Sequence, residues 1–531
     1  MNKKQAWNPY LPLDQYIPDG EPHVFGDRVY LFGSHDAEGG HTFCMLDYVV
    51  YSAPVDDLTT WTTGGISYRA AQDPAYPRRR YMYAPDVVRG NDGRYYLYYC
   101  MAGEYGVGGY QEPISVAVCD TPDGEYQYLG HVQNPDGSPM MRYVCFDPGV
   151  INDDGVIRLY YGTQYGYEEE PDFQTNPWYM QEEVAMFGRS REEILSYPDS
   201  IMGPVMLVLE DDMLTVKEQP KHIIPYRVKG TTFEQHPFFE AASMRKIHGT
   251  YYFIYSSWLN HELCYATSAY PDRDFTYGGT IISNGDIGYQ GRKPEEMLNM
   301  TGTTHGSLEC IEGQWYIFYH RLTHKSDYSR QACAEKVELR PDGSIAQVEV
   351  TSCGLNQGPL RAEGSYPAAI ACNLTNGHMP HGSNSVFKEA FPNVTNRGNE
   401  RFIGEIEEGT LIGYKYFDCR QVSRIGVIAR IEDETNQVVY DGPLRVDIRT
   451  QEFRFRDHTI RRPGMPTQEP QLEIRLSETG DAVATIRLDE ADNQWQCYSA
   501  DVDIPDGIHP IYLVYHGEKR IQLRELVFRI S

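Results

Sequence analysis

The sequence predicts an all-β protein in which a five-bladed β-propeller, residues 1–350, is followed by a linker, 351–385, and a β-sandwich, 386–531. Three observations lead to this prediction. A hairpin pattern recurs five times in the first two thirds of the chain, convincing amphipathic helices are scarce, and the last third shows short alternating strands. At 531 residues the chain is also long enough for more than one domain.

The first domain is predicted from five copies of one pattern, a turn followed by an aromatic-rich strand. The copies are FGDRVYLFGS, NDGRYYLYYC, DDGVIRLYYG, IHGTYYFIYS and IEGQWYIFYH. Gly-containing dipeptides between strands of β-branched and aromatic residues are the expected signal of a tight β-hairpin. The turns recur every 62 to 94 residues, at Asp27, Gly93, Gly155, Gly249 and Gly313. Each repeat is long enough for a four-stranded sheet, and five sheets arranged radially form a propeller.

The longest interval separates the third and fourth repeats, and it contains YEEEPDFQTNPWYMQEE and REEILSYP. We expect a loop with a short helix between those two blades. This insertion could wall a pocket, build a dimer contact, or do neither. The sequence therefore leaves the oligomeric state open.

The second domain follows turn-rich, weakly periodic sequence that predicts the linker. From residue 386 the chain shows short alternating strands, among them LIGYKYFDC, RIGVIARIE, LEIRLSE, ATIRLDE, QCYSADVDI and IYLVYHG. Their spacing is typical of a β-sandwich. The closing run WQCYSADVDIPDGIHPIYLVYHGEKRIQLRELVF resembles carbohydrate-binding modules of family 6. The resemblance implies a domain that either binds glycan or serves only as a packing partner for the propeller.

The composition excludes several classes of partner. The net charge of −28 repels nucleic acid and anionic membranes, whereas a neutral sugar meets no such repulsion. The first residues lack the apolar segment of a signal peptide, and no stretch approaches eighteen apolar residues, so we expect a cytoplasmic protein. The 11 cysteines are scattered without a Cys-x-x-Cys pair, which indicates reduced thiols rather than disulfides or a zinc motif. We expect no organic cofactor.

Candidate catalytic residues stand at one position of each repeat. The innermost strand of a propeller blade lines the axis, so residues at its entrance converge on a central mouth. Four of the five residues have a local alternative: a turn or strand-entry position for the aspartates, and a hydrogen-bonded core position for the histidine. No folding requirement places an acid there in four successive blades, so the set indicates metal binding or glycosidic bond cleavage. Seven to nine residues before the five turns are Asp19, Asp86, Asp147, Glu240 and His305.

Together these segments resemble glycoside hydrolase family 43, a family of five-bladed propellers, over about residues 7–350. The motifs are NPYLP, IPDGEPHVFGDRVYLFGSHD, YAPDVV, FDPGVINDDG, FFEAASMRKIHGTYYFIYSS and HGSLECIEGQWYIFYHR. The resemblance implies an inverting mechanism with Asp19 as general base and Glu240 as general acid, standing roughly 6.5 to 9.5 Å apart. It implies that Asp147 orients the acid and raises its pKa. Where the family has Asp-Pro-Ser this chain has Asp-Gly-Glu, which leaves Glu21 as a rival base.

The resemblance also implies supporting residues. Arg330 resembles an arginine that contacts both the modulating aspartate and the sugar, with a surface arginine as the alternative. Asp86 resembles a supporting residue of the second blade and is a further candidate for binding substrate. His305 resembles an axial histidine that some members use with a calcium ion, whose shell water would complete. Four further residues near the expected mouth would bind sugar or pack in the core: His35, Asp36, Tyr83 and Trp258.

The function that the sequence predicts is hydrolysis of a terminal pentose from plant hemicellulose oligosaccharides by an exo-acting, inverting enzyme. The two activities expected are those of an α-L-arabinofuranosidase and a β-D-xylosidase, which motif spacing does not separate. Action on arabinan or galactose-containing glycans is an alternative. A non-catalytic sugar-binding propeller is a further alternative, but it would require the loss of a catalytic acid, and all three motif positions are acidic.

Overall fold

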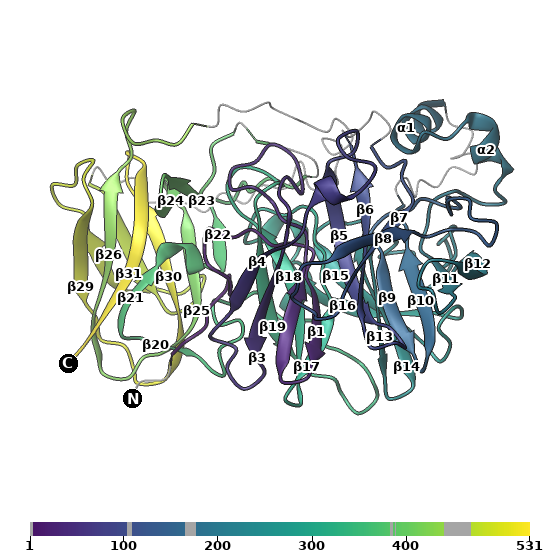
Figure 1. The fold of residues 1–531 in the computed structure, drawn as a ribbon. Coiled ribbons are helices and arrows are strands. Elements are labelled where there is room, and N and C mark those ends of the chain that lie inside the picture. The colour runs from purple at the N-terminus through teal and green to yellow at the C-terminus, as the bar shows by residue number, and fades with distance from the viewer. Residues whose placement is uncertain (1–3, 104–108, 165–176, 383–385, 388, 440–468) are drawn as a thin grey trace.

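The computed structural model describes residues 4–103, 109–164, 177–382, 386–387, 389–439 and 469–531 (Figure 1). Five sheets follow one another in chain order, and two larger sheets form a second domain. In Figure 1 the purple-to-teal strands build the first domain and the green-to-yellow strands the second. The predicted all-β architecture, a five-bladed propeller followed by a β-sandwich, is confirmed.

Each blade is an antiparallel sheet whose strands pair in sequence order. The first two blades are β1 (Glu21–Phe25), β2 (Arg28–Phe32), β3 (Tyr48–Pro54) and β4 (Thr62–Tyr68), then β5 (Tyr81–Arg89), β6 (Tyr95–Ala102), β7 (Ile114–Cys119) and β8 (Gln127–His131). The third blade is β9 (Gly149–Asp153), β10 (Val156–Tyr161), β11 (Val205–Leu209) and β12 (Val216–His222). The last two are β13 (Phe238–Ile247), β14 (Thr250–Ser257), β15 (Glu262–Ser268) and β16 (Thr276–Ser283), then β17 (Leu308–Ile311), β18 (Gln314–Leu322) and β19 (Arg330–Val337).

The five predicted hairpins join the first two strands of each blade. In the last three blades both turn residues have positive φ, for example 51° at Asp154 and 94° at Gly155. Two successive left-handed residues are the mark of the type I′ turn, whose twist matches that of paired strands. The Gly in these dipeptides therefore fixes where each inner strand ends.

The amino-terminal segment closes the ring between the fifth and first blades. The backbone N–H of Tyr10 donates to the carbonyl of Ala332, and the Asn8 side chain bonds the backbone N–H and carbonyl of Ala334, so both bind along β19. One hydrophobic cluster joins Leu31 of the first blade to Phe318 of the fifth. The chain's start thus packs against the last propeller strand.

The described part of the insertion contains two helices. They are α1 (Pro177–Phe187) and α2 (Arg191–Ser196), and the Ser190 side chain caps α2 by accepting from the backbone N–H of Glu193. Both lie between β10 and β11, so the insertion is inside the third blade and not between the third and fourth blades as expected. Neither described helix is long and apolar enough to cross a membrane.

Within the described residues, the second domain is a sandwich of two six-stranded sheets. One sheet contains β20 (Leu360–Arg361), β22 (Asn373–Thr375), β25 (Leu411–Asp418), β27 (Gln471–Arg475), β28 (Ala482–Arg487) and β30 (Ile508–His516). The other contains β21 (Gly364–Pro367), β23 (Asn393–Arg397), β24 (Glu400–Ile406), β26 (Val422–Ile431), β29 (Gln496–Asp501) and β31 (Ile521–Ile530). A single core of buried apolar side chains lies between them.

The predicted linker, 351–385, is wrong as a linker because it supplies β20, β21 and β22 to the sandwich. The two domains also share buried polar contacts. Lys415 of the sandwich is almost fully buried, and its ammonium group lies 3.3 Å from Asp286 and 2.9 Å from Glu349 of the preceding domain. Burying a paired lysine between domains indicates a fixed interface and not a flexible tether.

Candidate active site

Predicted acids from three blades converge around the imidazole of His305 at the propeller axis. Nδ1 of His305 lies 3.6 Å from Asp147 Oδ2 and 3.9 Å from Asp19 Oδ1, and Nε2 lies 3.9 Å from Glu21 Oε1. Glu240 joins the group because the backbone N–H of its neighbour Ala241 donates to Asp147 Oδ2. Apart from the half-buried Glu240, these side chains are buried.

Glu21 and Asp19 occupy opposite sides of the His305 ring. Glu21 faces Nε2 of His305, and its other oxygen accepts from Arg245 at 2.8 Å and from Ser243 at 3.1 Å. Asp19 faces Nδ1 of His305, on the same side as Asp147. The imidazole therefore separates Glu21 from the Asp19–Asp147 side, which favours Asp19 over its rival as the base.

Arg330, the first residue of β19, is buried and holds two aspartates. Its Nη1 donates to Asp19 Oδ1 at 2.7 Å, while Nε and Nη2 bind the two oxygens of Asp36 at 2.8 and 3.0 Å. Its guanidinium carbon lies 4.6 Å from the centre of the Phe43 ring. A bidentate pair fixes the plane of an arginine, so Asp36 orients Arg330 toward Asp19. These hydrogen bonds place Arg330 on the expected base, whereas the resemblance implied contact with Asp147.

His320 of β18 was not among the predicted residues. Its Nδ1 accepts the backbone N–H of Asp19 at 3.2 Å, and its Nε2 lies 2.9 Å from the carbonyl of Thr303. The carbonyl can only accept, so Nε2 carries the proton and the tautomer is fixed. Burial lowers the pKa of His320 to about 3, so the ring is neutral. It therefore positions the Asp19 backbone.

The electrostatic environment separates the two expected catalytic carboxyl groups. Burial opposes ionisation of Asp19, but Arg330, together with smaller contributions from His305, His320 and Ser34, more than offsets it and lowers the pKa of Asp19 below its usual value. Burial and the charge of Asp19 raise the pKa of Glu240 to about 8. Burial also raises the pKa of Asp147 well above its usual value, and negative charge on Glu240 or Asp19 raises it further when those groups are ionised. At neutral pH the site thus contains an ionised Asp19 and a protonated Glu240.

Backbone strain accompanies the acids. Asp19, Asp147 and Ala241 have φ values of 58°, 46° and 67°, a left-handed region that non-Gly residues adopt rarely. Such conformations concentrate at functional sites, where the surrounding fold holds them. The strand β13 also shifts register on both sides of Glu240, between Phe238 and Glu240 and between Glu240 and Ser243, so the pairing with β14 is irregular around the acid.

Two predicted sugar-binding residues lie too deep to contact a substrate. Asp86 is fully buried and accepts from the backbone N–H of Val87 and of Val150, both at 2.7 Å, while His23 Nε2 lies 2.6 Å from it. It links the second and third blades, in keeping with a supporting role. Asp36 is equally buried and binds Arg330. Both serve to position other groups because substrate cannot reach them.

Aromatic rings surround the acids. Tyr83 packs with ring centres 5.7 Å from Phe146, 5.8 Å from Tyr110 and 6.4 Å from Phe43, and Phe43 carries the Arg330 guanidinium. Half-buried Trp258 packs edge-on against Phe239, the neighbour of Glu240, at 5.6 Å, while half-buried His35 hydrogen-bonds the Asp47 carbonyl. Phe43, Tyr110 and His320 were missed in the sequence. His320 lies in the FYHR end of a quoted motif, whereas no turn or repeat singles out the other two.

Comparisons with known proteins agree on one family. The sequence pattern of glycosyl hydrolases family 43 matches residues 12–184. A xylosidase/arabinosidase of Thermoclostridium stercorarium is 39% identical to this chain over 98% of both sequences. Xylosidase/arabinosidase 43A of Humicola insolens is 29% identical, over 62% of this chain and 96% of its own. The solved structure of a family 43 enzyme from Xanthomonas citri complexed with xylotriose is 25% identical over 65% of this chain and 94% of that chain, with a TM-score of 0.50.

Proposed function

The chain belongs to glycosyl hydrolase family 43, and we propose that Asp19, Asp147 and Glu240 carry out its hydrolytic reaction. It is a glycoside hydrolase that acts on the ends of oligosaccharides and releases a terminal pentose. Relatives named xylosidase/arabinosidase support xylose and arabinose as the released sugars, and one of these relatives is similar to this chain over nearly the full length of both sequences. The substrate is an oligosaccharide, and its preferred linkage is what the experiments below establish.

The proposed mechanism is a single displacement with inversion. Glu240 donates its proton to the glycosidic oxygen as the bond to the anomeric carbon breaks. Asp19 accepts a proton from a water molecule, whose oxygen attacks the opposite face of that carbon. The products are the free pentose with inverted configuration and the shortened oligosaccharide. Asp147, which accepts from the N–H beside Glu240, keeps the acid in place.

One observation carries this proposal: the same group of residues lowers the pKa of one acid and raises that of the other. An inverting glycosidase needs an ionised base and a protonated acid at the same pH. Arg330 makes the largest contribution that lowers the pKa of Asp19, because it hydrogen-bonds Asp19 directly. The charge of Asp19 in turn keeps the proton on Glu240.

The test compares Asp19→Asn, Glu240→Gln and Glu21→Gln on xylo- and arabino-oligosaccharides, with product anomers followed by NMR. The first two variants should lose about 100-fold or more in kcat, the scale of general acid or base loss. Glu240→Gln should lose less on nitrophenyl pentosides, because a good leaving group needs little protonation. Retained configuration in the wild type would refute single displacement. If Glu21→Gln loses as much as Asp19→Asn and also keeps the wild-type thermal stability, Glu21 and not Asp19 is the base.

A divalent cation of the calcium type fits the axial channel, on the Glu21 side of His305. Glu21 Oε1 is buried and lacks a hydrogen-bond partner, and Glu21, His23 and Asp86 each place a ligand atom within 4.8 Å of the others. Calcium prefers carboxylate oxygens, so Glu21 and Asp86 would bind it together with His305 and water. When bound, the ion would add fixed positive charge behind Asp19. Thermal unfolding with added calcium tests this: the midpoint should rise in the wild type and not in Glu21→Gln.

A further inference from the structure

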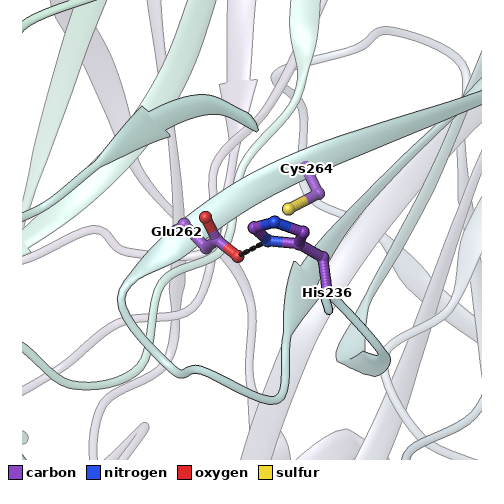
Figure 2. A group of neighbouring side chains, drawn as sticks. All are labelled: His236, Glu262 and Cys264. Carbon is purple, nitrogen blue, oxygen red and sulfur yellow. Dashed lines mark hydrogen bonds and ion pairs between the residues drawn. The ribbon is translucent and has the colours of Figure 1, made fainter. Parts of the chain in front are cut away.

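A second cluster of potential metal ligands lies in the fourth blade, away from the axis. His236 stands two residues before β13, while Glu262 and Cys264 are alternate residues of β15 and so face the same side of the sheet. Figure 2 shows the three side chains pointing toward one another. Each offers one ligand atom within 4.8 Å of the other two. No metal motif is visible in the sequence here because His236 lies 26 positions before Glu262.

The geometry needs only a small adjustment to hold an ion. His236 Nδ1 and Glu262 Oε1 are 2.6 Å apart, whereas nitrogen and oxygen ligands of tetrahedral zinc, each ~2.0–2.1 Å from the metal, stand ~3.3 Å apart. His236 can supply the difference of less than ~1 Å because it precedes the strand and its side chain is 27% exposed. Glu262 and Cys264 are buried within β15 and would stay in place.

The carboxylate is already held as a metal ligand would be. Ser257 Oγ donates to Glu262 Oε1 at 2.6 Å, and Thr280 Oγ1 donates to Oε2 at 2.7 Å. Hydrogen bonds of this kind orient the ligands of protein metal sites. The Tyr277 ring stacks on His236, with centres 4.6 Å apart and planes 7° apart, and thereby fixes the imidazole plane.

We propose that His236, Glu262 and Cys264 form a binding site for a thiophilic divalent cation of the zinc class. A thiolate, an imidazole and a carboxylate are the donors that zinc takes, whereas calcium and magnesium avoid sulfur. The thiol proton leaves on binding, and water or Thr280, whose Oγ1 lies 3.8 Å from Cys264 Sγ, completes the shell. The half-exposed edge of His236 provides the way in.

The site has a structural consequence for the acid. It ties the segment that leads into β13 to β15, which lies beyond β14 in the same sheet, and Glu240 follows His236 by four residues. Ser257, which binds Glu262, pairs with Phe238 at the start of β13. A bound ion would therefore stabilise the end of β13 that carries Glu240.

The experiment uses the full chain in a Cys497→Ser background, because Cys497 is exposed and an exposed thiol would add a nonspecific metal ligand. Chelator-treated protein is titrated with Co²⁺ and then with Zn²⁺. We expect one equivalent of Co²⁺ to produce a thiolate-to-cobalt charge-transfer band, which Zn²⁺ abolishes. Saturating Zn²⁺ should also raise Tm by about 3 °C or more.

The variants decide the assignment. His236→Ala and Cys264→Ser should each remove the band and the Tm increase. The control Cys145→Ser removes another buried thiol, one that donates to the Met140 carbonyl, and should keep both responses. Half-exposed His236 is the safer variant should Cys264→Ser not fold. The proposal is overturned if the charge-transfer band persists in His236→Ala, or if the wild type binds less than one equivalent of Co²⁺.

Discussion

Arg330 links the two kinds of residue at the axis, those that react and those that orient them. It bonds Asp19 directly, and it is itself held by both oxygens of Asp36. A lysine could supply the charge, but it could not bond Asp36 and Asp19 in one rigid plane. The base is therefore kept ionised by geometry as well as by charge.

The raised pKa of Glu240 predicts the alkaline limit of activity. The acid must be protonated, so kcat/KM should fall as pH rises through about 8, while the acidic limit, set by the lowered pKa of Asp19, lies at low pH. In Glu240→Gln the residual rate should lose the alkaline limb. Glu335→Gln is the matched control, because burial raises the pKa of Glu335 to about 8 as well, yet its partners are Asn8, Tyr319 and Thr351. If the alkaline limb of the pH profile is unchanged in Glu240→Gln, that limb reports the titration of another group.

At this scale the sequence predicted the acids but not their supports. Asp19, Asp147 and Glu240 were found because they precede repeated turns, a local signal. Phe43 and His320 act through Arg330 and the Asp19 backbone, respectively, and these contacts join residues nearly 300 positions apart. Asp86 and Asp36 were expected to contact sugar because the sequence shows that a residue is charged but not how deeply it is buried.

At the scale of elements, the inner strands β9 and β13 approach closely beside the acids. Gly149 begins β9, two residues after Asp147, and a Cβ atom there would lie 2.2 Å from the carbonyl oxygen of Ala242. The backbone at Ala242 cannot move aside as the end of a flexible side chain can. Glycine at this position is thus required for the contact that brings Asp147 to the N–H of Ala241.

Gly149→Ala should separate those two strands. We expect a loss of about 1–3 kcal/mol in unfolding free energy from overpacking, and a fall in kcat of ~10-fold or more, because misplacement of a catalytic group is costly. Urea unfolding and steady-state kinetics measure the two effects. Gly358→Ala is the control, since nothing lies within 4 Å of its added Cβ. Full activity in a folded Gly149→Ala protein would show that Asp147 tolerates the shift.

The elements themselves were predictable where turn chemistry is strong. The five hairpins follow from Gly dipeptides, and the sandwich strands from their alternation. The insertion was assigned between blades because a repeat interval gives its length but not which strands flank it. The strands within the predicted linker were missed because β20, β21 and β22 have only two to four residues each, too few to show a period.

On the scale of the whole molecule, the sandwich reaches the active-site loops. Arg401 of β24 donates to both oxygens of Glu38, at 3.0 and 2.8 Å, and Glu38 follows Asp36 by two residues. In the same loop the Gly39 N–H donates to Ser329, the neighbour of Arg330. The loop that contains Asp36 and the segment that contains Ser329 both help to orient Arg330, and both are thus held near the sandwich. This arrangement favours the second domain as a packing partner, while the family 6 resemblance is not confirmed.

Arg401→Ala should therefore impair catalysis from outside the propeller. Freed from Arg401, the Glu38 loop would hold Asp36 and Arg330 less well, and we expect kcat to fall roughly 10-fold. Arg292→Ala is the matched control: its pair with Glu478 also joins the domains, and the exposed fractions, 21% and 22%, resemble the 18% and 22% of Arg401 and Glu38. Arg292 contacts neither active-site loop in the bonds described, so its variant should lose comparable stability and keep kcat. The exchange Glu38→Arg with Arg401→Glu should recover part of the activity. Equal kcat in the Arg401→Ala and Arg292→Ala proteins would mean that the sandwich stabilises the propeller without positioning its catalytic residues.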